Sequence, residues 1–168
     1  MTLPLADLKS PDLVKALALW DSWRGDGIAP LWDKIELSRF PPPLLPMTTV
    51  VDVLEGGRDY RYRYWGSELT RLFKRDETGN LLSLHSVTQS SDIRFHQFGA
   101  VVAEMRPVLF MTIFEKFEGV MAEKLNLRLP TIDGQGQVDK IISLSTLERV
   151  GMHSYDDLSE FLYGKTVG

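Results

Sequence analysis

The sequence predicts an α+β fold. Two short stretches with β-strand patterns, residues 48–54 and 60–64, are joined by a Gly-Gly turn. Helical patterns follow, and three longer strand patterns come after them at residues 108–117, 121–129 and 138–147. Successive strands with short connections form an antiparallel meander, so the chain order indicates a three-stranded meander preceded by helices. A length of 168 residues, 43% of them hydrophobic, is enough for one domain with its own core.

Composition excludes several classes of function. The formal net charge of −4 disfavours a protein that binds nucleic acid by neutralising many phosphates. The chain has no cysteine, which removes disulfides, thiolate nucleophiles and cysteine-ligated metal sites. No apolar stretch approaches the roughly 20 residues that span a bilayer, and the N-terminus lacks the pattern of a secretory signal. We therefore expect a cytoplasmic protein with no membrane partner.

The first helix is predicted from its start signal and its apolar face. Ser10 supplies a capping hydroxyl, Pro11 suits the first helical position, and Asp12 places an acid in the first turn. Apolar residues then recur at helical spacing: Leu13, Ala16, Leu17, Trp20 and Trp23. Such a face needs apolar cover, and two alternatives stay open: packing on the domain's own sheet, or contact with a second copy in a homodimer. Five prolines in residues 28–46 then rule out a long helix.

The next elements alternate between strand and helix patterns. In residues 60–64 three tyrosines alternate with two arginines, which predicts one face for Tyr60, Tyr62 and Tyr64. Ser67–Phe73 is predicted to be a short helix with Leu69, Leu72 and Phe73 turned inward. The DETG sequence that ends at Gly79 is typical of a turn that tolerates positive φ.

A longer helix is predicted from Ser90 or Ser91 to about Met105. Phe95, Phe98, Val102 and Met105 share one of its faces, and Arg106-Pro107 ends it. In the second of the late strands, Met121, Leu125, Leu127 and Leu129 alternate with Lys124, Asn126 and Arg128. Ser154, with Asp157 three residues on, predicts a final helix that reaches about Tyr163.

The order of these motifs resembles the PAS domain. The resemblance is to a bacterial PAS-like family with a short N-terminal helix, whose members have an arginine-rich strand, Gly-Thr, Leu-Phe and then Asp-x-Thr-Gly. Here GGRDYRYRYWGSEL, Leu72-Phe73, DETG and the strand after Pro107 take those places, over about residues 20–150. Two departures are that Ser67 replaces the usual threonine and that Lys74 stands where a glycine often follows Leu-Phe.

The resemblance implies a five-stranded antiparallel sheet of order 2-1-5-4-3 with helices on one face, plus N- and C-terminal helices. It divides the chain into an N-terminal helix (1–27), a PAS-like domain (28–150) and a C-terminal helix (151–168). It also implies a sensory or regulatory module that binds a small ligand in its core and signals through flanking helices to a partner protein or a second copy. The ligand cavity would lie between the inner sheet face and the small helices. The candidate pocket residues are Tyr62, Tyr64, Leu72, Phe73, Phe98, Val102, Phe110 and Leu127.

Several alternatives stay open at this point. The pocket candidates would equally fill a core, which would make the protein a ligand-free interaction module. A small cone-shaped α+β enzyme would need a buried His/Asp or Tyr/Asp pair, and no catalytic motif supports one. The alternating tyrosines and arginines of residues 60–64, which we call the ladder, also resemble a base-stacking platform for RNA. The acidic net charge of the chain disfavours that interpretation. We predict no catalytic residue and no nucleic-acid partner.

Cofactor binding is left open by the residues. The absence of cysteine excludes a cysteinyl–flavin adduct and a thioester-linked chromophore. Some PAS proteins bind haem through a histidine on the long helix, where this chain has His96, but helical spacing places it off the apolar face. The sequence therefore favours neither haem nor flavin. His85 and His153 lie far from it and complete no metal-ligand spacing, so we predict no metal site.

Overall fold

A six-stranded antiparallel sheet forms the centre of the molecule. The computed structural model describes residues 1–84, 89–117 and 120–148, without the side chains of residues 72, 89–91, 113–117, 120–123, 147 and 148. The strands are β1 (Thr2–Leu3), β2 (Thr49–Leu54), β3 (Asp59–Trp65), β4 (Val108–Phe117), β5 (Val120–Ile132) and β6 (Val138–Glu148). Their order is β1-β4-β5-β6-β2-β3. Without β1 this is the predicted 2-1-5-4-3 order, so the fold is PAS-like.

The sequence did not predict β1. Thr2 and Leu3 pair with Phe110 and Leu109 at the edge of β4. The backbone of Met1 extends this pairing, because its amino group donates to the Met111 carbonyl (3.0 Å) and its carbonyl accepts from the Met111 amide (2.9 Å). A two-residue strand has no periodicity to detect. Its effect is to cover part of the unpaired edge of β4.

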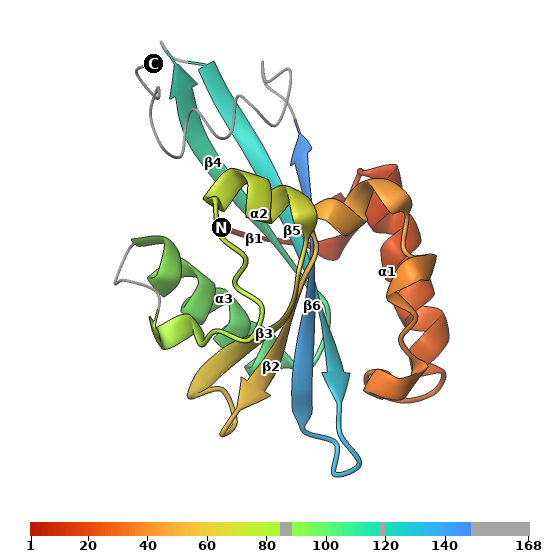
Figure 1. Ribbon diagram of the computed structural model, residues 1–168. Helices are drawn as coiled ribbons and strands as arrows, with labels where there is room; N and C mark the ends of the chain where they lie inside the picture. The colour runs from red at the N-terminus through yellow and green to blue at the C-terminus, as the bar shows by residue number, and fades with distance from the viewer. Residues whose placement is uncertain (85–88, 118–119, 149–168) are drawn as a thin grey trace.

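Helices cover both faces of the sheet. The short α2 (Ser67–Phe73), the turn η5 (Leu82–Leu84) and the long α3 (Gln89–Glu104) lie on one face, which we call the inner face. On the opposite, outer face lie α1 (Pro11–Arg24) and a proline-rich series of 3₁₀ turns. Figure 1 shows the two layers on either side of the strands. Among the described helices, none is long and apolar enough to cross a bilayer.

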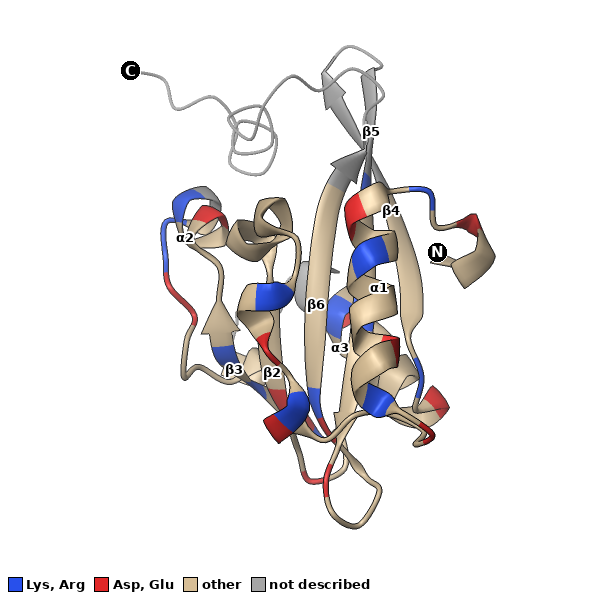
Figure 2. Ribbon diagram, turned by 90° about the vertical axis from the view of Figure 1, so that its right-hand side faces the viewer, with Lys and Arg blue, Asp and Glu red and all other residues tan. Residues whose placement is uncertain are grey.

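The N-terminal helix α1 packs on the domain's own sheet, which is the first of the two alternatives above. Leu13, Ala16 and Trp20 are buried, and the Trp20 indole Nε1 donates to the Pro130 carbonyl of β5 at 2.8 Å. Figure 2 shows α1 in front of the sheet, running along the strands on the side of β4, β5 and β6. The predicted cap is wrong in one detail, because the Ser10 hydroxyl makes no capping hydrogen bond. The predicted C-terminal helix in residues 151–168 lies outside the described residues.

The predicted alternation of tyrosines in β3 is wrong, because the strand contains a β-bulge. Val50 pairs with Tyr64 and the next residue of β2, Val51, pairs with Tyr62, so β3 has one extra residue at Arg63. The bulge reverses the alternation beyond that point. Tyr60, Tyr62 and Trp65 therefore face the inner core, whereas Tyr64 packs in the outer core.

Lys74 ends α2 in a left-handed conformation, with φ 54° and ψ 23°. This is the position where the resemblance expects glycine, and a side chain with a Cβ is strained there. We expect Lys74→Gly to raise the free energy of unfolding by about 1 kcal/mol. Urea denaturation measures the change. Lys9→Gly is the matched control, because Lys9 has no positive φ to relieve. An equal gain in both variants would contradict the strain argument.

Candidate functional site

The two sides of β5 differ in character, and the polar side is the inner one. Leu125, Leu127 and Leu129 are buried in the outer core beneath α1. Since alternate residues of a strand point to opposite faces, Lys124, Asn126 and Arg128 face α3. The prediction of Leu127 as a pocket residue is therefore wrong, as is that of Tyr64, because both side chains lie on the far side of the sheet.

The other predicted pocket residues lie together in the inner core. Tyr62, Phe98 and Phe110 are almost fully buried there, and Phe73 and Val102 pack against them. Leu72 belongs to α2, but its side chain lies outside the described set. The structure thus brings five of the eight candidates to one place.

Arg128 is the central polar residue of the inner face. It is only 5% exposed. Its guanidinium donates to the Gln97 side-chain oxygen of α3, at 3.2 Å from Nε and 2.6 Å from Nη2, and from Nη1 to the Ser143 hydroxyl of β6 at 2.6 Å. It also lies over the Phe98 ring, with Cζ 4.3 Å from the ring centroid. All of these partners are neutral, and burial lowers the pKa of Arg128 to about 10.

Lys124 lies on the same face of β5, four residues before Arg128. It is half-buried and opposite Thr112 of β4. Burial, followed by repulsion from Arg128 and Arg94, lowers its pKa to about 8. Arg94, on α3, donates to the Tyr62 hydroxyl at 3.1 Å. Within the described part of the chain, neither Lys124 nor Arg128 forms an ion pair with a carboxylate.

Asn126 lies between the two cations and carries a donor that no described residue uses. It is buried and sits opposite Phe110 on β4 and Ser145 on β6. The Ser145 hydroxyl donates to Asn126 Oδ1 at 2.8 Å. The side-chain amide Nδ2 has no hydrogen bond to the described residues, so this face offers cationic and neutral donors side by side.

A groove of about 750 Å³ opens at the edge of this layer, between α3 and the β1–β4 pair. Its walls are Asp92, Ile93, His96 and Gln97 from α3 and Met1, Thr2, Phe110, Met111 and Thr112 from the strands. Gln97 is also the acceptor for Arg128, and Phe110 and Thr112 are the cross-strand neighbours of Asn126 and Lys124. The groove therefore adjoins the basic part of the inner face.

His96 is exposed at the groove, as its helical spacing predicts. Its side chain is thus apart from the buried aromatic cluster of Phe98, Tyr60 and Tyr62. Within the described ranges, no group of three or more His, Asp and Glu residues could hold a metal ion.

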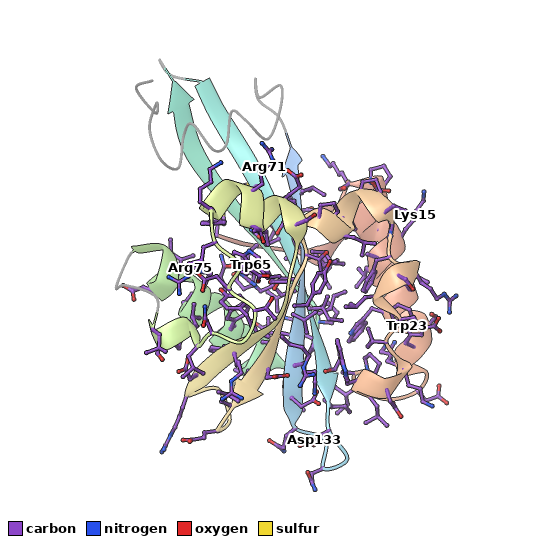
Figure 3. The ribbon with its side chains drawn as sticks, in the orientation of Figure 1. Lys15, Trp23, Trp65, Arg71, Arg75 and Asp133 are labelled. Atoms are coloured by element: carbon purple, nitrogen blue, oxygen red, sulfur yellow. The ribbon has the colours of Figure 1, made fainter. Side chains whose placement is uncertain are left out.

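Trp65 is an inner-core residue that the sequence prediction missed. Its ring makes edge contacts with Tyr62 at 4.9 Å and with Phe73 at 5.7 Å between centroids, and Figure 3 shows it between the sheet and the helices. Tyr60 and Tyr62 are 0% and 1% exposed, and burial raises the pKa of both hydroxyls. These rings therefore do not form an exposed platform for stacking bases, which removes that interpretation of the ladder.

Comparison with known proteins gives structural neighbours only. No family model matches the chain, and no curated protein matches it. Solved structures are similar to the chain, among them the following two. One is an RNA-binding light-oxygen-voltage receptor, with TM-score 0.39 and 20% identity over 67% of this chain and 35% of that chain. The other is a fungal LOV domain photoreceptor, with TM-score 0.40 and 15% identity over 82% of this chain and 94% of that chain. The chain spans about a third of the first neighbour's length.

Proposed function

We propose that this protein is a sensory module that binds a small ligand between α3 and the inner face of the sheet. The observation that carries the proposal is the buried Arg128, hydrogen-bonded to Gln97 at the wall of the groove. A protein that only needs a stable core gains little from a buried cation with neutral partners, because apolar residues of similar volume would serve as well. In a binding site, by contrast, such a cation can contact the ligand.

The same geometry suggests a route for the signal. Pro130, whose carbonyl accepts from Trp20 on the outer face, lies two residues beyond Arg128 on β5. A ligand that shifts β5 on the inner side would therefore change the docking of α1 on the other side. In this proposal α1 passes the change to a partner protein or a second copy in the cytoplasm, and no residue is catalytic.

The test is native mass spectrometry of the freshly purified full chain, compared with its mass after denaturation. We expect a non-covalent adduct that disappears on denaturation, and a visible absorption spectrum then shows whether the adduct is haem or flavin. A bare polypeptide mass, together with no stabilisation by any small-molecule probe, would instead support a ligand-free interaction module.

A further inference from the structure

We infer that the ligand is a small organic acid whose oxyanion group is bound by Lys124, Asn126 and Arg128. This inference rests on the proposed function and gives the chemical class of its ligand. An oxyanion here means a carboxylate or a phosphate ester, since both present charged oxygen acceptors to the same donors.

The charges on the inner face of β5 favour an anionic ligand. Lys124 and Arg128 lie on the inner face of β5, four residues apart. Burial of like charges costs free energy unless an anion compensates them. The buried carboxylate of Glu77 is engaged by Arg75 at 3.0 Å and by the Asn80 side-chain amide at 2.8 Å. Among the described residues, then, no carboxylate pairs with Lys124 or Arg128, and a bound anion would fill that role.

The hydrogen-bond donors on this face of β5 are spaced to contact one group. Lys124, Asn126 and Arg128 alternate along one strand, so successive Cα atoms on this face are about 7 Å apart. Asn126 is the short side chain in the middle, and the two long cationic side chains flank it. An oxyanion above Asn126 is thus within reach of the Lys124 ammonium, the Asn126 Nδ2 and guanidinium N–H groups that Gln97 and Ser143 leave unused.

Aromatic side chains lie where the rest of the ligand would extend. Phe110 lies directly opposite Asn126 and also lines the groove, and Phe98 stacks on the guanidinium of Arg128. A ligand with its charged group at Asn126 therefore extends along aromatic side chains toward the groove. The volume of about 750 Å³ lies in the ordinary range for a small-molecule site. An organic acid with an apolar or aromatic body therefore fits, because its charged group would meet the polar donors and its body would meet the aromatic side chains.

The experiment compares charged probes with uncharged counterparts on the full chain. Benzoate, octanoate, succinate and phenyl phosphate are titrated beside benzamide, octanamide, succinamide and phenol, with melting temperature and calorimetric Kd as the two measurements. We expect at least one anion to bind and to raise the melting temperature, while its neutral counterpart does neither. A preference for phenyl phosphate identifies a phosphate ester, and a preference for a carboxylate identifies a carboxylic acid.

Lys124→Met is expected to weaken binding of that anion by about tenfold or more, because it removes a charge-assisted contact. Lys124→Gln gives the same test if the methionine variant does not fold. Lys15→Met is the matched control, since Lys15 is exposed on the outer side of α1 and should leave Kd unchanged. Equal binding of acid and amide, or an unchanged Kd in Lys124→Met, overturns the inference but leaves the proposed function intact. No binding of any probe, with no adduct in the purified protein, overturns both.

Discussion

Substitution of Gly66 by alanine is expected to destabilise the protein by about 3 kcal/mol or more. Gly66 lies between β3 and α2, and its amide donates to the Thr48 carbonyl at 2.9 Å. A Cβ at this position would lie 2.2 Å from the Pro46 carbonyl oxygen and 2.6 Å from the carbonyl carbon. Both atoms belong to the backbone, so no side-chain rotation relieves the overlap. The chain would have to separate the 3₁₀ turn η4 (Pro42–Met47) from the start of α2.

The loss is measured by urea denaturation of Gly66→Ala against the natural sequence. Gly134→Ala is the matched control, because a Cβ there meets nothing within 4 Å and φ is not in the left-handed region. Its free energy of unfolding should change by less than about 0.5 kcal/mol. If Gly66→Ala is as stable as Gly134→Ala, the close approach of η4 to α2 is not a feature of the folded protein.

The main elements of this fold could be predicted because each has a local signal. The Gly-Gly turn, the α2 start at Ser67 and the three long strands all leave a pattern over neighbouring residues. The predicted bounds of α2 and β4 agree with the structure to the residue. The missed elements lack such a signal. The strand β1 has only two residues, and nothing in the sequence around Arg63 distinguishes a bulged strand from a regular one.

The site was harder to predict because the alternation of side chains along a strand does not say which face packs against which layer of helices. The alternation in β5 predicts that the leucines share one face, but the prediction of Leu127 as a pocket residue assigns that face to the wrong layer. In the structure they lie under α1, and the polar residues Asn126 and Arg128 face α3. One signal was available in the sequence. The apolar face of α1 and the proline-rich segment need an apolar sheet face to cover, which leaves the polar face for the other helices.

Substitution of Trp20 by alanine is expected to lower the free energy of unfolding by about 3–5 kcal/mol, the usual range for a buried large aromatic residue. Trp20 is 3% exposed, and its indole donates to the Pro130 carbonyl. The substitution therefore creates a cavity in the outer core and leaves a carbonyl without its partner. Val14→Ala on the same helix is the control, because Val14 is 46% exposed and contributes little. Thermal and urea denaturation measure both variants.

The outcome also separates the two roles that the sequence leaves open for α1. Leu127, Leu129 and Leu144 are fully buried on the outer face of the sheet, so undocking of α1 exposes the core itself. Trp20→Ala should thus lower the stability of the whole domain in a single transition, without a change in oligomeric mass. If α1 instead served mainly as a contact between copies, light scattering would show Trp20→Ala dissociating the oligomer while the unfolding midpoint stayed unchanged. That result would contradict the packing of Trp20 on Pro130, and with it the proposed route from β5 to α1.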